Sequence, residues 1–436
     1  MNNNSDIIVS LDIGTTKICA LVGKANEDGT ITILGQGEAT SQGLMRGVIT
    51  NIDLTVNAIK EAILIAENKA GVKIKDVFVG IAGQHIKSIQ HRGYMMRDND
   101  MDEICQEDID KLIQDMHKLV LPPGDKIIHV LPQEFIVDNE EGIKHPCGMS
   151  GVRLEADFHI ITGQTTATKN IYRSVDKAGY EVSELILEPI ASCSAVLNEM
   201  EKEAGVALVD IGGGTTDIAI FHDGIIRHTA VIPLGGNTVT EDVKEGCRVM
   251  KKHAERMKVK YGSAVPNLAH DNQVVVIPGL RGGDAKEVSI KALAQIIEAR
   301  MEEIIEHVYY EIRRSGFEKR LIGGIVLTGG GSQLNKLDEL VKSMTGLPTR
   351  VGNPIENVDH NRSEALNNPK YATAVGLLLQ GLQAKQRIFG NNVFNEQRPE
   401  MQREDNQTKG WLGNISNKWK EFFELDDIPD FNSSRN

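Results

Sequence analysis

The sequence predicts an α/β protein whose core is a duplicated pair of domains. Two segments about 200 residues apart share one pattern, an apolar strand followed by Asp-Ile-Gly and threonine: Leu11–Lys17 and Val209–Ile220. A third glycine-rich segment, Ile325–Leu334, also follows an apolar strand and precedes apolar residues at helical spacing. The repeat predicts two similar domains, each with its own glycine hairpin.

Each paired segment is typical of a β-hairpin with a glycine turn. Glycines let the backbone present N–H groups to an anion, and threonine hydroxyls add further donors. An aspartate at the strand end suits Mg²⁺, usually through waters. We therefore expect the hairpins to bind a nucleotide's phosphates from two sides, with Asp12 and Asp210 holding Mg²⁺ through water. The other expected phosphate-binding residues are Gly14, Thr15, Thr16, Lys17, Gly212, Gly213, Gly214, Thr215 and Thr216.

A single Asp-x-Gly-x-Thr segment is more often an ordinary turn than a binding site. Two matching copies at domain spacing, together with the third glycine cluster, favour a nucleotide site instead. The third cluster's glycines allow the backbone to approach a flat adenine ring or its ribose closely. Its expected binding residues are Gly329, Gly330, Gly331 and Ser332.

Composition excludes several classes of protein. The 436 residues, 40% hydrophobic and 25% charged, fit a globular chain of two or more domains. A formal net charge of −13 argues against nucleic-acid binding, which depends on basic patches. The five cysteines lack CxxC spacing, so we expect reduced, mostly buried thiols and neither a disulfide framework nor a zinc site. We expect a chain that is neither secreted nor membrane-spanning.

Two phosphate hairpins and a downstream glycine loop resemble the actin-like ATPase superfamily. Five further segments together resemble the FtsA family of bacterial cell-division proteins: Gly43–Asp53, Ala82–Ser88, His129–Asp138, Gly148–Gly163 and Leu187–Leu197. The resemblance spans roughly residues 5 to 385. It implies an actin-like, ribonuclease H-like duplicated α/β fold with an FtsA-type inserted subdomain and a C-terminal amphipathic helix.

The resemblance also implies a division into domains. Residues 1–84, 163–193 and 355–390 would form the first actin-like domain (1A), and 194–237 with 320–354 the second (2A). Residues 85–162 would be the inserted subdomain (1C), which contacts later division proteins and neighbouring protomers in the family. Residues 238–319 would be subdomain 2B.

Glu188 precedes a proline at the crossing from the first domain to the second. The matching glutamate of actin-like chaperones positions the attacking water, so the resemblance implies that Glu188 orients water at a γ-phosphate. Alternatively, Glu188 caps the following helix, which we expect over residues 190–199.

Two further binding positions come from the resemblance. Glu255 and Lys258, three apart on one helix face, would bind ribose and adenine; a solvated ion pair is the alternative. Arg300 lies on a long helix expected over 290–313, which resembles the docking site for the C-terminal tail of the tubulin-like protein FtsZ. A charged helix is also typical of a solvated face.

The end of the chain changes in character. Residues 391–410 are polar and predict a flexible linker, 411–425 predict an amphipathic membrane-targeting helix, and 426–436 form an acidic tail. Both tryptophans lie on the helix's apolar stripe, which comprises Trp411, Leu412, Ile415, Trp419, Phe422 and Phe423. Glu421 and Glu424 offset its lysines, so we expect weak attraction to anionic lipid. Folding of this helix back onto the globular body is the alternative.

The expected function is that of an ATP-binding, actin-like division protein at the cytoplasmic face of the cell membrane. It would polymerise, anchor the FtsZ ring through its C-terminal helix and recruit later division proteins. ATP and Mg²⁺ would act mainly as an assembly switch, and a weak ATPase activity stays open. A small-molecule, sugar-type kinase on the same fold is the alternative.

Overall fold

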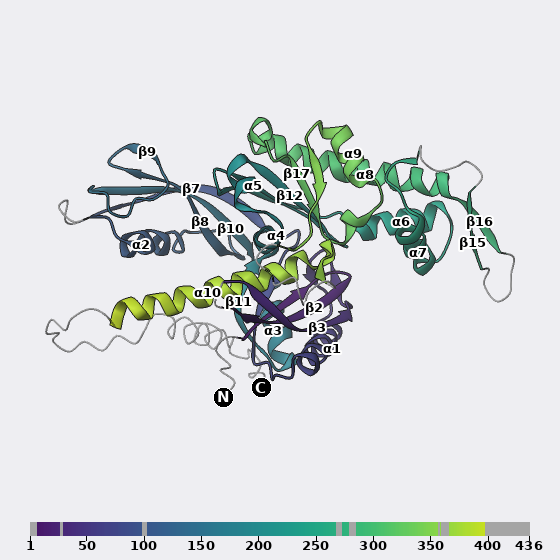
Figure 1. Cartoon of the computed structure of the whole chain (residues 1–436), viewed down its shortest axis with the longest axis horizontal. Coiled ribbons are helices and arrows are strands. Elements are labelled where there is room, and N and C mark those ends of the chain that lie inside the picture. Colours follow the sequence, from purple (N-terminus) through teal and green to yellow (C-terminus); the bar gives the residue numbers. More distant parts are fainter. Residues whose placement is uncertain are drawn as a thin grey trace, which may run out of the picture. The chain divides into compact units, whose positions relative to one another are not determined.

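The computed structural model describes residues 7–26, 29–97, 103–266, 273–278, 285–355, 358 and 366–396, with side chains up to residue 386. The chain divides into a compact unit, Met1–Lys385, and a second unit, Gln386–Asn436. The fold described below is that of the compact unit (Figure 1). No helix in the described ranges is long and apolar enough to cross a bilayer.

The first half of the chain forms a five-stranded sheet with the order β11-β6-β1-β2-β3. Antiparallel pairs join β1 to β2 and β2 to β3, whereas β6 runs parallel to both β1 and β11. The strands are β1 (Ile7–Ile13), β2 (Lys17–Ala25), β3 (Ile31–Thr40), β6 (Asp76–Ile81) and β11 (Glu181–Leu187). A small hairpin, β4 (Leu44–Met45) with β5 (Val48–Ile49), follows β3.

Helices α1 (Ile52–Ala70) and α3 (Thr165–Ala178) pack together against this sheet. Asn51 caps α1 by accepting a hydrogen bond from the Leu54 N–H, and Gly71 ends the helix in the left-handed conformation. The helix lies so close to β3 that a Cβ at Gly37 would sit 1.9 Å from the Ala62 carbonyl oxygen. Only glycine fits there.

The second half repeats the topology with the order β14-β13-β12-β17-β18. Again three strands are antiparallel in chain order and two more join in parallel. The strands are β12 (Val206–Ile211), β13 (Thr216–His222), β14 (Ile225–Ile232), β17 (Ile325–Thr328) and β18 (Thr349–Val351). The repeat confirms the predicted duplicated α/β fold.

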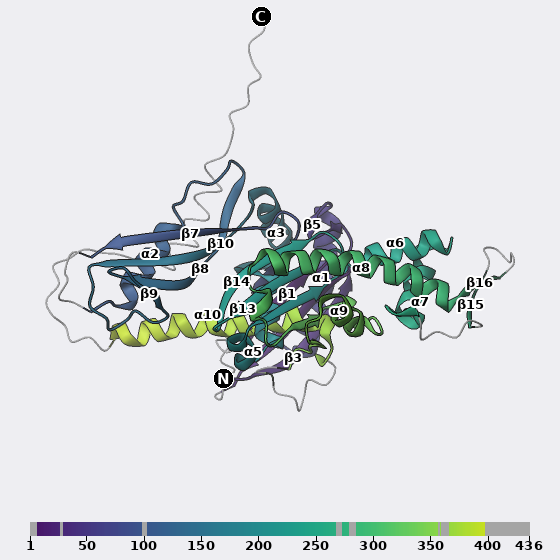
Figure 2. The same cartoon turned by 90° about the horizontal axis from the view of Figure 1, so that it is seen from above.

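Helix α8 (Ile290–Arg314) packs on the second sheet through its apolar stripe (Figure 2). Together with it lie α9 (Leu337–Thr345), α6 (Gly236–Gly246) and α7 (Lys251–Tyr261), which share one core. The hairpin β15 (Val274–Ile277) and β16 (Lys286–Ser289) precedes α8. The helix predicted over 290–313 thus extends from Ile290 to Arg314.

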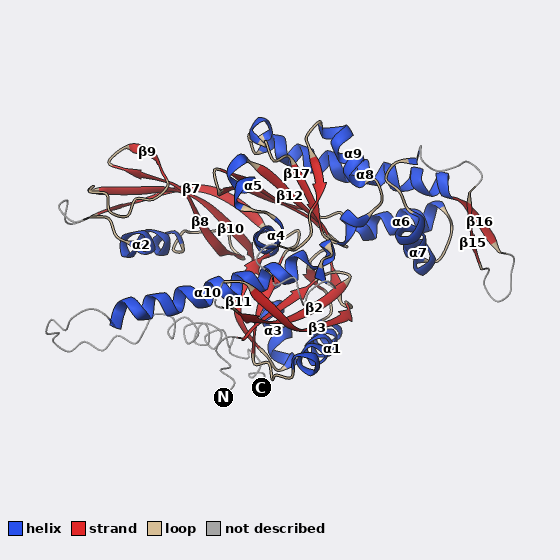
Figure 3. Cartoon of the chain, in the orientation of Figure 1, coloured by secondary structure: helices blue, strands red, loops and turns tan. Residues whose placement is uncertain are grey.

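Between β6 and α3 the chain builds a separate four-stranded sheet with the order β7-β10-β8-β9 (Figure 3). Its strands are β7 (Lys87–Met96), β8 (Asp125–Val137), β9 (Glu140–Ile143) and β10 (Arg153–Gln164). Helix α2 (Gln106–Met116) buries Ile109, Leu112 and Met116 against the sheet in a core of its own. This arrangement is the inserted subdomain.

Two helix predictions differ from the structure. The helix predicted over 190–199 is two helices, α4 (Glu188–Val196) and α5 (Glu199–Ala204), because Asn198 caps the second by accepting from the Glu201 N–H. The closing helix α10 (Ala372–Glu396) enters the segment assigned to the linker, since residues 391–396 contain neither proline nor glycine, whereas Pro399 follows. The remainder of the predicted linker, 397–410, lies outside the described residues.

Candidate functional site

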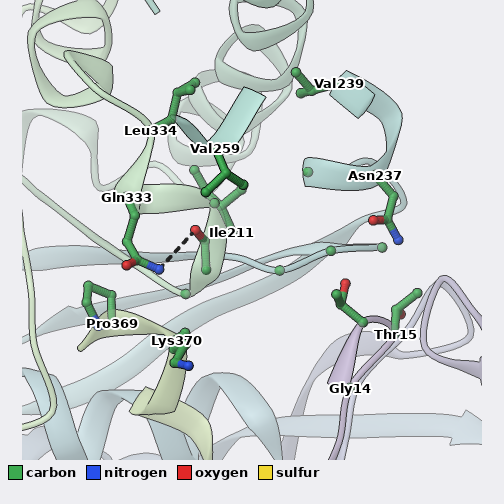
Figure 4. A pocket seen from close by; sticks show the side chains of 18 of the residues that line it. Gly14, Thr15, Ile211, Asn237, Val239, Val259, Gln333, Leu334, Pro369 and Lys370 are labelled. Carbon is green, nitrogen blue, oxygen red and sulfur yellow. Dashed lines mark hydrogen bonds between the residues drawn. The ribbon is translucent and has the colours of Figure 1, made fainter. Parts of the chain in front are cut away.

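A cavity of about 800 Å³ opens where the two glycine hairpins meet. Figure 4 shows Thr15 of the first hairpin, Asn237 and Val239 of α6, and Gln333 and Leu334 beyond β17 around it. Every predicted nucleotide-binding residue except Thr216 and Ser332 lines this cavity. A volume of this size fits a small-molecule ligand.

The two hairpins interlock at their turns. A Cβ at Gly213 would lie 2.0 Å from the Thr16 hydroxyl oxygen, and one at Gly214 would lie 2.6 Å from the Thr15 hydroxyl oxygen. Only glycine therefore lets the second turn approach the first so closely. Backbone N–H groups and threonine hydroxyls from both domains therefore meet where these turns line the cavity, as an anion site requires.

Thr216 and Ser332 are turned away from the cavity. The buried Thr216 hydroxyl donates to the Leu234 carbonyl at 2.9 Å, because β13 places alternate side chains on opposite faces. The Ser332 hydroxyl donates to the Gly329 carbonyl at 2.8 Å and so closes the 3-10 helix η5 (Gly330–Gln333). Both hydroxyls thus stabilise the loops that carry their binding neighbours.

Three aspartate carboxyl groups lie in the two hairpins. Burial raises the pKa of Asp12 to about 6 against the opposing effect of Lys17, and raises the pKa of Asp217 to about 8 with help from Asp210. The pKa of Asp210 is also raised by burial, although hydrogen bonds from Ser192 at 2.8 Å and Thr373 at 3.3 Å oppose the shift. Such a crowded group of acids favours a cation.

No group of three or more histidine, cysteine, aspartate or glutamate residues within the described ranges has the geometry to hold a metal ion by itself. The two aspartates expected to act through water belong to different hairpins: Asp12 pairs with Cys19 across the first, and Asp210 with Asp217 across the second. The donor set, carboxylate oxygen, is the one that Mg²⁺ prefers.

Lys17 supplies the positive charge of the first hairpin. Its ammonium group lies 3.9 Å from an Asp12 carboxylate oxygen and 4.6 Å from the centre of the Tyr371 ring. The Nζ atom is buried and has no hydrogen-bond acceptor among the described residues. Because a buried ammonium without an acceptor is costly, this position suits an anionic ligand.

Glu188 is the first residue of α4, and its side chain lines the cavity. Leu187 is the N-cap residue of this helix and Glu188 is the acidic residue of its first turn, where a carboxylate interacts favourably with the helix dipole, so the alternative interpretation is also compatible with this position. Burial, followed by the charges of Asp12, Asp217 and Asp210, raises the pKa of the Glu188 carboxyl well above its usual value.

Glu255 and Lys258 lie on α7 and line the cavity. Their charged groups are 2.8 Å apart, and Lys258 also donates to the Gly236 carbonyl and the Thr240 hydroxyl, both at 2.9 Å. Only 15% of the Lys258 side chain is exposed. The ion pair that the alternative predicted is therefore present. Its lysine, however, is mostly buried and links α7 to the start of α6.

Arg300 lies apart from the cavity. Its guanidinium makes a two-pronged contact with Asp242 of α6, at 2.5 and 3.1 Å, and a further ion pair with Glu303. A quarter of the side chain is exposed. The six predicted membrane residues, Trp411 to Phe423, lie outside the described residues.

Several residues of the site were not predicted from the sequence. The cavity is also lined by Asp217, Asn237, Lys370 and Thr373. The Ser192 hydroxyl donates a hydrogen bond to Asp210 and so orients its carboxylate. Asp217 follows the second hairpin's threonines directly and could have been found from that segment. The others approach from distant parts of the chain and carry no local motif.

Comparison with known proteins identifies the chain's relatives. A family model described as "Cell division protein FtsA" matches residues 207–376, and one described as "SHS2 domain inserted in FTSA" matches 83–162. Cell division protein FtsA of Pseudomonas aeruginosa is 43% identical over 86% of this chain and 89% of its own length. The Escherichia coli K12 protein of the same name is 36% identical over 86% and 90%.

Solved structures share the fold at low identity. A structure titled "PilM-PilN type IV pilus biogenesis complex" matches with a TM-score of 0.63 at 17% identity, over 86% of this chain and 98% of the matched chain. MreB5 of Spiroplasma citri bound to ADP matches with a TM-score of 0.53 at 15% identity, over 89% and 98%. These neighbours confirm the actin-like fold, and the relatives are division proteins instead of the sugar kinases considered as an alternative. The chain belongs to the FtsA family of bacterial cell-division proteins.

Proposed function

We propose that the chain binds ATP with Mg²⁺ in the cavity between the two hairpins and uses the nucleotide mainly to control its own assembly during division. The observation that carries this proposal is the interlocking of Gly213 and Gly214 with Thr16 and Thr15. A ligand held by both turns favours one arrangement of the two domains over others. MreB5 of Spiroplasma citri shares the fold, and its solved structures contain bound ADP or AMPPNP.

Each group around the cavity has a part in this proposal. The hairpin turns and Lys17 would bind the phosphates, and Asp12 and Asp210 would hold Mg²⁺ through its waters. Glu255, Lys258 and the glycines 329–331 would bind the ribose and adenine. Mg²⁺ would neutralise phosphate charge next to the buried carboxylates, while Glu188 would orient a water molecule for slow hydrolysis.

The proposed partners follow from family membership and from residues outside the cavity. Subdomain residues 85–162 would contact later division proteins and neighbouring protomers, and α8 with Arg300 would bind the C-terminal tail of FtsZ. Residues 411–425 would attach the chain to lipid at the cytoplasmic face of the membrane. Nucleic acid is not among the proposed partners, given the net charge of −13.

Calorimetry of Asp210→Ala tests the nucleotide site. The variant should bind ATP at least about tenfold more weakly than the parent in Mg²⁺ buffer, and the two proteins should differ less in EDTA. Equal affinities in Mg²⁺ buffer would show that the hairpins do not form the phosphate site. Asp115→Ala, on the exposed face of α2, serves as the matched control.

Electron microscopy on lipid monolayers tests the assembly and membrane proposals together. Filaments should appear with ATP on lipid, and deletion of 411–436 should abolish lipid attachment while ATP binding stays intact. Persistent co-sedimentation of the deletion variant with liposomes would refute the membrane role of the terminal helix.

A further inference from the structure

Two exposed cysteines of the inserted subdomain lie on neighbouring chain segments. Cys105 and Cys147 are exposed, whereas Cys19, Cys193 and Cys247 are buried. The Gly148 N–H donates to the Ile104 carbonyl at 2.9 Å, so the peptide units that directly adjoin the two cysteines are hydrogen-bonded to each other.

The surrounding contacts fix how these segments face each other. Glu103 and Ser150 form an antiparallel bridge, and the Ile104 N–H donates to the Met149 carbonyl at 2.8 Å. The bridge alone would set Cys105 opposite Gly148, but the Gly148 N–H bonds to the Ile104 carbonyl, so the pairing shifts by one residue and Cys105 and Cys147 lie just beyond that bond. Residues in this position of an antiparallel pair have Cα atoms about 4.5 to 5.5 Å apart. A disulfide needs Cα atoms about 4.4 to 6.8 Å apart, so the arrangement is compatible with one.

The local backbone supports this placement. Cys105 is extended, with φ −116° and ψ 172°, at the start of α2, and its thiol lies 3.5 Å from an Asp108 carboxylate oxygen. Cys147 is on the tip of a turn closed by a 3.1 Å hydrogen bond from the Met149 N–H to the Pro146 carbonyl. At both positions, rotation of the cysteine side chain about χ1 changes the direction in which the thiol points.

We propose that Cys105 and Cys147 form a reversible disulfide when the protein meets a peroxide. One thiolate attacks a peroxide oxygen, the O–O bond breaks, and a sulfenic acid and hydroxide form. The other thiol sulfur then attacks the sulfenic sulfur, the S–S bond forms, and the sulfenic S–O bond breaks; the hydroxyl group leaves with the proton of the attacking thiol as water. The proton released by the first thiol converts the hydroxide from the peroxide into the second water. Two thiols and one hydrogen peroxide thus yield one disulfide and two waters.

The disulfide would join the start of α2 to the loop before β10. This corner is already tied by Arg97, whose guanidinium donates to the Glu103 carbonyl at 2.8 Å and to the Gly151 carbonyl at 2.7 Å. Because α2 supplies the helical half of the subdomain core, the bond would hold this helix against the sheet. The carboxylates of Glu107 and Asp108 lie near the Cys105 thiol, which is not the electropositive environment of a reactive cysteine. We therefore expect the closeness of the two cysteines, and not unusual reactivity of either thiol, to favour the disulfide.

Peptide mapping of the full chain after hydrogen peroxide treatment tests the site. The monomer should lose two hydrogen atoms and both exposed thiols, release a peptide linked through Cys105 and Cys147, and recover both thiols with dithiothreitol. Cys147→Ser should abolish the link, whereas Cys247→Ser, at a buried thiol, should retain it. Separate oxygen addition at the two cysteines, a link between chains, or two unreacted thiols would each overturn the proposal.

Discussion

Gly213 of one domain and Thr16 of the other are in contact across the cavity, although nearly half the chain separates them. A Cβ at Gly213 would lie 2.0 Å from the Thr16 hydroxyl oxygen and 3.4 Å from the Asn237 amide nitrogen. The two turns can therefore approach each other this closely only because residue 213 has no side chain.

Gly213→Ala should weaken ATP binding because the new methyl group forces the hairpin turns apart. Overpacking of this kind costs about 1 to 3 kcal/mol, or roughly fivefold to 140-fold in affinity. Isothermal titration calorimetry of the purified chain in Mg²⁺ buffer measures the loss.

Thr16→Ala provides the internal control, since it removes the hydroxyl that the new methyl group meets. Gly213→Ala should cost less in the Thr16→Ala background than in the parent chain. Equal costs in both backgrounds would mean that the two turns do not meet when nucleotide binds.

The hairpins themselves could be predicted because their pattern is local. An apolar strand, a glycine turn and a second strand occupy contiguous residues, and β1–β2 and β12–β13 pair in the register that this order dictates. Residues that complete the site from elsewhere could not be predicted. Ser192 and Thr373 reach Asp210 from α4 and α10, and only the packing of these helices determines that contact.

Asp217→Asn should stabilise the nucleotide-free protein at neutral and higher pH. Burial raises the Asp217 pKa to about 8, so between about pH 4 and pH 8 the folded state holds a proton that the unfolded state has released. The free energy of unfolding therefore falls as pH rises through this window, by at most about 1.4 kcal/mol per pH unit from this group.

Urea unfolding at about pH 5 and about pH 8 measures this effect. The parent should lose more stability than Asp217→Asn between the two values, whereas Asp115→Asn, at an exposed carboxyl, should follow the parent. Parallel profiles for the parent and Asp217→Asn would contradict the raised pKa.

Ser192→Ala should weaken Mg²⁺-dependent nucleotide binding without touching the nucleotide. Its hydroxyl donates to Asp210 at 2.8 Å and opposes the upward shift of that pKa. Loss of the bond should therefore favour the protonated acid and misorient it, at a cost of about 1 kcal/mol. ATP titrations at several pH values should show the largest deficit at low pH, and a deficit independent of pH would indicate a purely steric effect.

The proposed binding of the FtsZ tail by Arg300 should depend on how far Asp242 releases the Arg300 guanidinium. Asp242→Asn removes the two-pronged partner, so the proposed affinity for an FtsZ tail peptide should rise, whereas Arg300→Glu should lower it about tenfold or more. Fluorescence anisotropy with a labelled peptide distinguishes these outcomes. Equal binding by Arg300→Glu and the parent would place the tail site elsewhere.

The inserted subdomain also contacts the second domain, which its position within the first half of the sequence does not indicate. Arg227 of β14 forms an ion pair with Glu134 of β8 at 2.6 Å, and Gln133 donates to the Ile226 carbonyl at 2.8 Å. Such contacts depend on side chains that meet only after both sheets have formed. No periodicity within either segment encodes them.

Arg227→Ala should lower the free energy of unfolding by about 2 kcal/mol, because only 10% of this side chain is exposed and it also packs over the Phe317 ring. Glu134→Gln should cost less than about 1 kcal/mol, since its carboxylate is more exposed.

A double-mutant cycle by urea unfolding isolates the interaction between Arg227 and Glu134, for which we expect a coupling of about 0.5 to 1 kcal/mol that shrinks at high salt. Lys118→Ala, at a pair within the subdomain, is the matched control and should show no coupling to Arg227. Strict additivity of Arg227→Ala and Glu134→Gln would mean that the two sheets are not held together by this pair in solution.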